Sequence, residues 1–343
     1  MAGKVVTIKD IALQLNISIS TVSRALQNNP EISILTRMNV QKLAKELCYR
    51  PNPIAVSLKT HKSHMIGIVV PEIVNSFFAT VVMSVEKVAE KYGYNVLMVS
   101  SNESFEKERK NIDIFMSYRM DGIILSLSKE TNTFDHITDI QDNNIPLVLF
   151  DRTTKELNVS KVVADDADAA YKIVKHLIHG GAKRVALLTG SEHLSIAKSR
   201  TKGYLQALAS NKFKVDQNLI VRIDDFSVAS AKEATKQLLM LKNRPDAIFG
   251  INDDLAIGAI QAIKEQKLRI PEDIAVFGFS NSQRSQYMNP SVSTVNQFPQ
   301  KIGELAAELL FDQILDPKHA RTRKEVVSSE LIVRDSSDRP YIF

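Results

Sequence analysis

Apolar residues near the N-terminus of the chain recur at helical spacing. Ile8, Ile11, Ala12 and Leu15 follow the i, i+3, i+4, i+7 pattern of a helix with one buried face. Polar residues stand where helix N-caps are expected, and they predict three helices that begin after Thr7, Ser18 and Ser33 and end near Asn16, Gln27 and Leu47. The first part of the chain is therefore predicted to be three short helices around a small core.

From Met65 onward, continuous apolar runs alternate with amphipathic stretches. The runs have the character of parallel strands covered on both faces, and the clearest lie at 66–70, 122–127, 146–150, 185–188, 247–250 and 274–279. This alternation predicts an α/β fold with two doubly wound lobes, in which ligands bind at the carboxyl ends of the strands. We expect the chain to cross between the lobes near Val163, Thr294 and Val326.

Composition narrows the class of protein. A chain of 343 residues with 44% hydrophobic residues is too long for one ordinary core and predicts two or three packed domains. The single cysteine, Cys48, excludes an intramolecular disulfide, and its apolar helical surroundings favour a buried structural thiol. Residues 1–10 lack the apolar core of a signal peptide, and no run approaches the roughly 20 apolar residues of a membrane helix. We therefore expect a cytoplasmic protein with no membrane partner.

The charge of the chain is unevenly distributed. Residues 1–62 hold nine Lys and Arg against three acidic residues, whereas the other 281 residues hold 35 basic and 36 acidic residues. A basic head on a near-neutral body indicates contact with a polyanion, although a solvated basic terminus would show the same balance. The predicted second helix turns Val22 inward and leaves Ser20, Ser23 and Arg24 outward, which is typical of a helix-turn-helix.

Several segments carry a resemblance to a known family. The stretches 7–12 (TIKDIA), 17–18 (IS), 21–26 (TVSRAL) and 49–52 (YRPN), followed by Ala55 and Leu58, resemble the lactose-repressor/galactose-repressor family. The resemblance continues to about Asp335 and so covers nearly the whole chain. It implies a helix-turn-helix head that binds operator DNA, a hinge helix, and a two-lobed domain like the periplasmic binding proteins that senses a small molecule.

The resemblance divides the chain into three parts. Residues 1–51 are expected to be the DNA-binding domain, 52–62 the hinge helix and linker, and 63–343 the effector-binding and dimerisation domain. Within the last part, lobe one is expected at about 63–163 and 294–325, and lobe two at about 164–293 and 326–343.

The resemblance places the base-reading positions on Ile19, Ser20 and Arg24. Arg24 can reach the O6 and N7 atoms of guanine in the major groove. Ile19 also continues the apolar stripe of its helix, so two interpretations stay open: a core residue, or an apolar contact to a thymine methyl group. Contacts that position the head on phosphates are expected from Thr7, Ser18, Thr21, Ser23 and Arg37.

The hinge is predicted to be a short helix over residues 53–59, capped by Asn52. Such a helix is too short to be stable alone and should need a partner. The resemblance implies that Leu58 is a wedge inserted into the minor groove, with Ala55 beside it and Lys59 near the backbone. Many relatives carry arginine after the alanine, and Val56 departs from that pattern. A plain linker is the alternative interpretation.

Polar and aromatic residues gather where the predicted strands of the body end, and they match the effector positions of the family. The candidate effector-binding residues are Phe77, Phe78, Asp151, Arg152, Arg200, Phe226, Asn252 and Ser280. Hydrogen-bonding groups and rings in one cleft suit a sugar. Many relatives have aspartate at the position of Ser280. The alternatives are that the two phenylalanines belong to the core and that Asp151 and Arg152 form a surface pair.

These features predict a sequence-specific, ligand-responsive regulator, a repressor, that binds a palindromic operator as a homodimer and is controlled by a carbohydrate. A nucleobase or phosphorylated sugar stays open as effector, as does the sign of regulation. No catalytic motif and no cofactor site is evident, so we expect no enzyme. The competing hypotheses are a periplasmic sugar-binding protein, a hidden hydrolase, and a nonspecific DNA-packaging protein.

Overall fold

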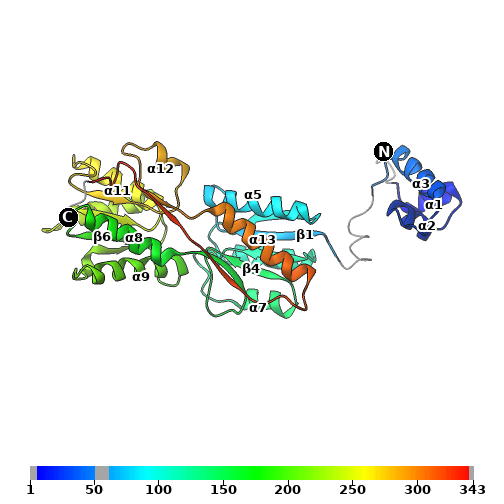
Figure 1. Cartoon of the computed structure of the whole chain (residues 1–343), viewed down its shortest axis with the longest axis horizontal. Coiled ribbons are helices and arrows are strands. Elements are labelled where there is room, and N and C mark those ends of the chain that lie inside the picture. The colour runs from blue at the N-terminus through cyan, green and yellow to red at the C-terminus, as the bar shows by residue number, and fades with distance from the viewer. Residues whose placement is uncertain (1–5, 51–61, 340–343) are drawn as a thin grey trace. The chain divides into compact units, whose positions relative to one another are not determined.

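A computed structural model describes residues 6–50 and 62–339. The chain divides into two compact units, Met1–His64 and Met65–Phe343, which we call the head and the body (Figure 1).

The described residues 6–50 of the head form three helices, α1 (Ile8–Leu15), α2 (Ile19–Leu26) and α3 (Ile34–Glu46). Thr7, Ser18 and Ser33 are their N-cap residues, and Asn16 ends α1 in the left-handed conformation, as the sequence predicts. The core of the head is small, and its fully buried side chains are Ile11, Val22, Ala25 and Val40. Helical periodicity and cap residues together therefore identified the three helices and the faces that α1 and α2 bury.

The expectation that Cys48 is buried was wrong. The cysteine is exposed and has a positive φ of 52°. It follows the C-cap residue Leu47, where the chain leaves the helix. The apolar periodicity of Leu43, Ala44 and Leu47 ends before residue 48, so the helix face that it defines does not include the thiol.

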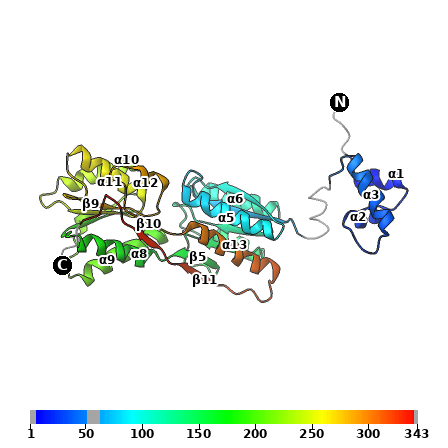
Figure 2. The ribbon, with the colours of Figure 1, turned by 45° about the horizontal axis from the view of Figure 1, so that its top comes forward.

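Lobe one of the body is built on a six-stranded sheet with the order β11-β5-β4-β3-β1-β2, in which each strand runs parallel to its neighbours. Helices α5 and α13 pack side by side (Figure 2) and share one core with the sheet. Helices α6 and α7 share the core on its other face. The elements of this lobe are β1 (Met65–Val70), α5 (Ser76–Lys91), β2 (Asn95–Ser100), α6 (Phe105–Ser117), β3 (Gly122–Leu125), α7 (Asp135–Asp142), β4 (Leu147–Phe150), β5 (Ser160–Ala164), α13 (Pro299–Leu315) and β11 (Lys324–Val327).

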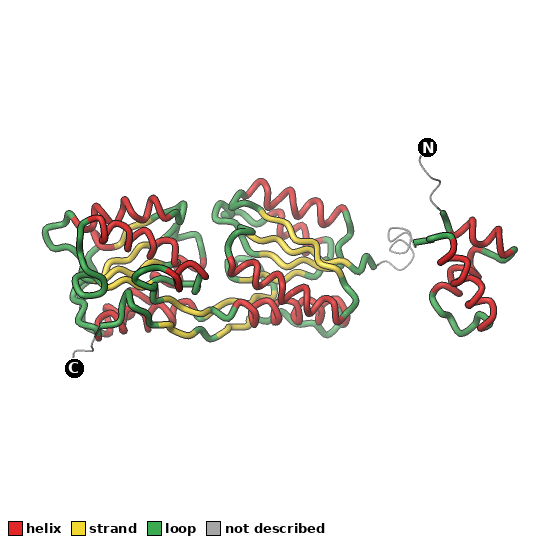
Figure 3. Tube along the Cα trace, turned by 90° about the horizontal axis from the view of Figure 1, so that it is seen from above, coloured by secondary structure: helices red, strands yellow, loops and turns green. Residues whose placement is uncertain are grey.

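Lobe two repeats this design on a four-stranded parallel sheet with the order β7-β6-β8-β9. Helices α8 and α9 pack as one pair and α10 and α11 as another, and Figure 3 shows the strands of each lobe between layers of helices. The elements are α8 (Asp166–His179), β6 (Val185–Thr189), α9 (Ser195–Ser210), η1 (Gln217–Leu219), β7 (Ile220–Arg222), α10 (Val228–Leu239), β8 (Ala247–Gly250), α11 (Asp253–Glu265), β9 (Ala275–Phe277) and α12 (Gln283–Tyr287).

Three segments join the lobes. The chain passes from β5 to α8, and β10 (Thr294–Asn296) and β12 (Glu330–Ile332) form an antiparallel pair along the other two crossings. The whole of β11 belongs to the sheet of lobe one, so the last crossing follows Val327. The two-lobed, doubly wound α/β fold expected from the sequence is confirmed. Among the described residues, no helix combines the length and apolar character needed to cross a membrane.

Candidate functional site

The N-terminal turn of α2 is polar and exposed. Ser18 Oγ accepts a hydrogen bond from the Thr21 N–H at 3.0 Å and lies 2.7 Å from Ser20 Oγ and 2.8 Å from Thr21 Oγ1. Ser18, Ile19 and Ser20 are all exposed. Three hydroxyls therefore surround a helix N-terminus, where backbone N–H groups and the helix dipole favour an anion.

The exposure of Ile19 distinguishes between its two interpretations, a core residue and an apolar contact to DNA. Its side chain is 46% exposed, whereas Val22, one turn later, is fully buried. The core of the head is thus complete without Ile19. The interpretation that remains is an apolar contact made outside the head.

The two arginines predicted to contact DNA have different surroundings. Arg24 projects from α2 and forms an exposed ion pair with Glu31, with 3.0 Å between Nη1 and Oε2. Such a pair contributes on the order of 1 kcal/mol or less, so Arg24 can exchange Glu31 for another acceptor at little cost. Arg37 instead donates from Nη1 to the Asn28 carbonyl at 3.1 Å and holds the loop before α3.

The other candidate contacts of the head are divided between described and undescribed residues. Thr7 donates from its N–H and its hydroxyl to the Asp10 carboxylate at 2.8 and 2.7 Å. Thr21 and Ser23 are half-buried on α2. The predicted hinge contacts lie outside the described residues, and they are Asn52, Ala55, Leu58 and Lys59.

All eight candidate effector-binding residues of the body line one pocket between the two lobes. The pocket encloses about 430 Å³, part of it open to solvent. Four further residues, which the sequence did not single out, complete its lining: Asn75, Ile196, Ile251 and Gln297. Asn75, Ile196 and Ile251 lie within four residues of a candidate in sequence, and Gln297 lies at a lobe crossing. None of them stands out by residue type, so only the fold reveals them.

Lobe one contributes aromatic rings from the start of α5. The Asn75 side chain caps this helix by accepting from the Phe77 N–H at 3.0 Å. Phe77 and Phe78 meet edge to face at 5.2 Å, and Phe78 packs in the same manner against Phe150 at 6.1 Å. The two residues are buried in the core of lobe one and also line the pocket, so the two interpretations of them are compatible.

Asp151 and Arg152 follow β4 and are buried, each about 8% exposed, so the surface-pair alternative was wrong. Arg152 Nη1 donates to Glu103 Oε2 at 2.6 Å, and its guanidinium lies 6.0 Å from the ring centroid of Phe78. Burial raises the pKa of Asp151 to about 6, against the attraction of Arg152 and Arg200. Asp151 also has a positive φ of 55°, a left-handed conformation that turns the chain at the strand end.

Lobe two contributes Arg200, which is buried inside α9. Its Nη2 lies 2.7 Å from Asp166 Oδ1, its Nη1 donates to the Ile251 carbonyl at 2.5 Å, and its guanidinium stacks over Phe279 at 3.6 Å. Burial raises the pKa of Asp166, and the attraction of Arg200 opposes that shift. Arg200 thus joins α8, α9 and the end of β8 behind the pocket.

Three further residues of lobe two are held by local backbone geometry. Asn252 caps α11 through its side-chain oxygen, which accepts from the Leu255 N–H at 2.8 Å. Phe226 and Ser280 both have positive φ, 55° and 108°. The ring of Phe226 lies so close to Gly190 that a Cβ there would be 2.4 Å from the ring, so any other residue at that position would displace the ring.

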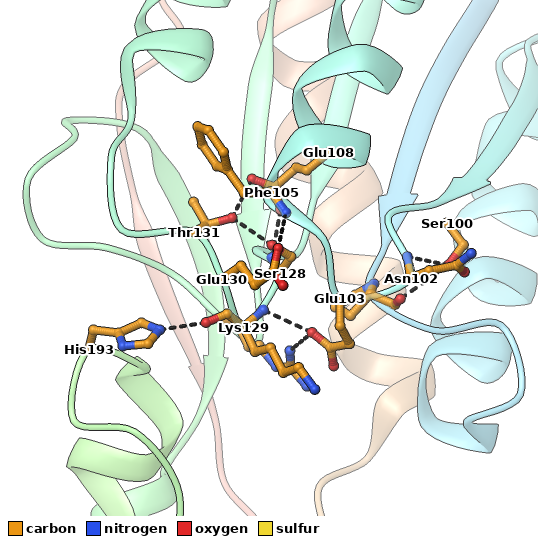
Figure 4. Close-up of polar contacts among 12 residues, drawn as sticks. Ser100, Asn102, Glu103, Phe105, Glu108, Ser128, Lys129, Glu130, Thr131 and His193 are labelled. Carbon is orange, nitrogen blue, oxygen red and sulfur yellow. Dashed lines mark hydrogen bonds and ion pairs between the residues drawn. The ribbon is translucent and has the colours of Figure 1, made fainter. Parts of the chain in front are cut away.

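A polar network extends from the pocket to one rim of the cleft (Figure 4). Glu103 Oε2 accepts from Arg152 and also from the Lys129 N–H at 2.8 Å. The Lys129 carbonyl, in turn, accepts a 2.5 Å hydrogen bond from His193 Nε2 of lobe two. The loop that carries Lys129 is held by buried Glu108, which accepts from the Ser128 N–H at 2.5 Å and the Thr131 hydroxyl at 2.8 Å.

A second recess adjoins the pocket and shares Asn75, Asn252 and Ser280 with it. It encloses about 810 Å³, part of it open to solvent, and forms a mouth to the cleft. The charged residues that line it are Glu72, Asp253, Asp254 and Arg284. Among the described residues, no group of three or more His, Cys, Asp or Glu side chains is placed to hold a metal ion.

Comparison with known proteins gives consistent results for the two units. Residues 7–52 match the family model of bacterial regulatory proteins of the lacI family. Residues 63–336 match the model of periplasmic binding proteins and the sugar binding domain of the LacI family.

Relatives match over almost their whole length. The chain is 34% identical over 331 residues to the HTH-type transcriptional repressor CytR of Escherichia coli (strain K12), covering 96% of each protein. It is 37% identical over 340 residues to the probable HTH-type transcriptional repressor ExuR of Bacillus subtilis (strain 168), covering 97% of this chain and 99% of the relative. The lac repressor dimer bound to operator and the anti-inducer ONPF has the same fold, with a TM-score of 0.85, 23% identity, and coverage of 97% and 99%.

Proposed function

Because the chain belongs to the LacI family of bacterial transcription regulators, we propose that it is a cytoplasmic repressor that binds a near-palindromic operator as a homodimer and responds to a carbohydrate in the cleft of its body. The observation that carries the proposal is that one chain joins an exposed helix-turn-helix to a two-lobed body whose eight candidate residues line a single pocket. The relatives compared above are transcriptional repressors, not enzymes.

For DNA binding, the support is the chemistry of α2. Ile19, Ser20 and Arg24 project from a helix whose opposite face is buried. Their proposed roles are an apolar contact, an adaptable hydrogen bond and a bidentate contact to guanine. Thr7, Ser18, Thr21, Ser23 and Arg37 are proposed to contact phosphates, and Asn52, Ala55, Leu58 and Lys59 to serve the hinge.

The homodimer is supported by exposed apolar surface on the body. An apolar groove in lobe two is lined by Val228, Ile257, Tyr287 and Met288, and Tyr287 is 77% exposed. In lobe one, Met83 on α5 is 69% exposed. Exposed apolar side chains that line a groove together are one feature of protein interfaces. A second copy of the chain would cover these residues, and two heads would then contact two half-sites of one operator.

Effector control follows from the position of the pocket. Asp151 and Arg152 belong to lobe one, whereas Arg200, Phe226 and Asn252 belong to lobe two. A ligand that contacts both lobes favours one lobe angle over the others, and the angle is proposed to set the docking of the two hinges. Effector and operator must then change the affinity of each other by the same factor.

Operator selection tests this proposal. The purified chain is incubated with random duplexes, the bound fraction is sequenced, and binding to the enriched motif is titrated with a panel of sugars and over a salt series. We expect a palindrome, steep loss of affinity with salt, and a shift of affinity with one sugar. Binding without an enriched motif and without any ligand effect would instead indicate nonspecific DNA packaging.

Two variants sharpen this test. Arg24→Ala should relax the preference at one base pair and lower operator affinity roughly 10-fold to 100-fold. Lys45→Ala, an equal loss of charge at an exposed position of α3, should weaken binding to all DNA sequences slightly and leave the enriched motif unchanged.

A further inference from the structure

The buried ion pairs around the pocket leave one acidic side chain in excess. Arg152 is paired with Glu103 at 2.6 Å and Arg200 with Asp166 at 2.7 Å. Each arginine is therefore neutralised by its own acid before any ligand binds. Asp151 remains as an additional buried carboxylate, and among the described residues no donor makes a hydrogen bond to it.

Two buried donors of the pocket complement this acceptor. Arg152 Nε and Gln297 Nε2 have no hydrogen-bond partner among the described residues, although Arg152 is 8% and Gln297 2% exposed. Buried donors without acceptors are costly, so a ligand that supplies acceptors gains that energy. A hydroxyl group can donate to Asp151 and accept from Arg152 or Gln297, whereas a carboxylate or phosphate can only accept from the two donors.

The mouth of the cleft carries the same excess of acid. Asp254 pairs with Arg284 at 2.8 Å, and buried Asp253 accepts hydrogen bonds from the Ser282 N–H and the Thr294 hydroxyl, both at 2.6 Å. Glu72 is the other acidic residue of the lining. A negatively charged ligand would be repelled by the acidic residues of the mouth. It would be repelled again by Asp151, which is buried in surroundings of low dielectric.

We propose that the effector is an uncharged sugar whose hydroxyls donate to Asp151 and accept from Arg152 and Gln297, and that sugar acids and sugar phosphates are rejected. This inference rests on the proposed function and specifies its ligand. The discrimination comes from Asp151, because both arginines of the pocket are already paired.

Calorimetric titration of the full chain tests the proposal with matched ligands. The probes are glucose, galactose and mannose, each beside its uronic acid and its 6-phosphate, and ribose beside ribose 5-phosphate. At least one uncharged sugar should bind, with its acid and phosphate counterparts at least 100-fold weaker. A charged member that binds more tightly than its uncharged partner overturns the proposal, as does binding by no member of the panel. Retained operator selection in either case leaves the DNA-binding part of the proposed function standing.

Asp151→Asn separates charge from shape. The variant should bind the uncharged sugar at least 10-fold more weakly than the native chain does, and it should discriminate less against the corresponding uronic acid. It should also melt at a higher temperature without ligand at pH 7.5, because a buried charge has been removed, so weakened binding would not reflect misfolding. Asp168→Asn, an exposed acid on α8, is the matched control and should change neither property. Unchanged sugar binding by Asp151→Asn overturns the proposal.

The pH profile gives a further readout. Asp151 is faced by Arg152, Arg200, Asp166 and Glu103, and its pKa of about 6 means that it loses its charge as the pH falls through that value. Affinity for the uncharged sugar should therefore decrease below pH 6 in the native chain, and this decrease should be absent in Asp151→Asn. An affinity that rises as the pH falls would contradict the role of the carboxylate as acceptor.

An independent observation carries a second inference, on the rim that contains Lys129 and His193. The Lys129 carbonyl can only accept, so His193 must carry its proton on Nε2, and Ser191 Oγ, 2.7 Å from Nδ1, then donates to the other nitrogen. Arg222 Nη2 donates to the same Ser191 Oγ at 2.5 Å. Each group in this chain of hydrogen bonds therefore has a defined direction of donation.

A second hydrogen bond crosses between the lobes, from the Thr153 N–H of lobe one to Ser195 Oγ of lobe two at 3.1 Å. On the lobe-one side, buried Glu108 holds the loop of Lys129 (Figure 4). Glu103 joins that loop to the pocket residue Arg152. We infer that His193 is a positioning residue that clasps the two lobes together in the absence of ligand.

Hydrogen exchange tests the clasp without any ligand. His193→Ala should increase amide exchange at Thr153 at least 5-fold, because Thr153 reports the other contact between the lobes and is not a neighbour of His193 in sequence. His193→Gln, whose amide can still donate to the Lys129 carbonyl, should restore much of the protection. His319→Ala, at an exposed histidine paired with Asp316, is the control. Faster exchange confined to 128–131 and 191–195, with Thr153 unchanged, would reduce His193 to a local loop contact and overturn the inference.

Discussion

The head and the body present their candidate residues in opposite ways. In the head, Ser18, Ile19, Ser20 and Arg24 lie on the outside of a core with few fully buried side chains, and their contacts are with residues close in sequence. In the body, Asp151, Arg152 and Arg200 are buried, and the two arginines are held by partners from 34 to 51 residues away. The head is built to meet a surface, whereas the body is built to enclose a small molecule.

The difference is also energetic. An exposed pair such as Arg24 with Glu31 can be exchanged at little cost, which suits a residue that must change partners on DNA. A buried pair such as Arg200 with Asp166 cannot be broken cheaply, because either charge left alone is desolvated without compensation. Substitutions in the two units should therefore change stability by different amounts, and each should affect only the unit that carries it.

The largest effect is expected from Arg200→Ala. It leaves Asp166 buried without its cation, and we expect a loss of roughly 3–5 kcal/mol from the free energy of unfolding of the body. Urea unfolding followed by hydrogen exchange in each unit would measure it. The double variant Asp166→Asn with Arg200→Gln should recover part of the loss. A body that keeps its native stability in Arg200→Ala would show that the pair is not desolvated.

Val22→Ala should give the next largest effect, confined to the head. Val22 is fully buried between the three helices, and removing its methyl groups should cost about 2 kcal/mol. Because the core of the head is small, that loss should produce partial unfolding visible as lost protection in residues 8–46. Equal loss of protection in the body would contradict the separation of the two units. Leu13→Ala, at an exposed position of α1, should be neutral.

Ser18→Ala should destabilise the head by about 1 kcal/mol. The substitution removes the side-chain acceptor of the Thr21 N–H at the start of α2. Ser18→Asn, which retains a capping oxygen, should restore most of the stability. If the head unfolds at the same temperature in the native chain, Ser18→Ala and Ser18→Asn, the cap is not a source of stability.

The smallest effect is a pH dependence confined to the body. His176 is buried against Ser337, and burial lowers its pKa below the ordinary value of 6.5. The unfolded chain then binds more protons near pH 6, so this contribution to stability is present above pH 6.5 and is lost as the pH falls. His176→Gln should flatten the decrease in melting temperature between pH 7.5 and 5.5. His319→Gln should leave that decrease unchanged.

Sequence patterns predicted much of the molecule, but with different completeness in the two units. The caps at Thr7, Ser18 and Ser33 and the buried face of α2 follow from spacing within single helices. Most of the eight pocket residues were found because the carboxyl ends of parallel strands meet at one edge of a sheet, whereas Arg200, inside a helix, and Phe226 were found by the family resemblance. Cys48 shows the limit of such patterns, because a periodicity does not say at which residue it ends.

The partners of the pocket residues could not be read from the sequence. In the sequence, Glu103, Asp166 and Gln297 are ordinary polar residues. The packing of α8 beside α9 brings Asp166 to Arg200. The left-handed conformations of Asn102 and Glu103 accompany the turn that brings Glu103 to Arg152. The sequence by itself determined the helices, the strands and the side chains that face the cleft, because those depend on local periodicity and on where strands end. The tertiary structure alone decided which charges are already paired, because Coulomb interactions depend on distance and burial and not on position in the chain.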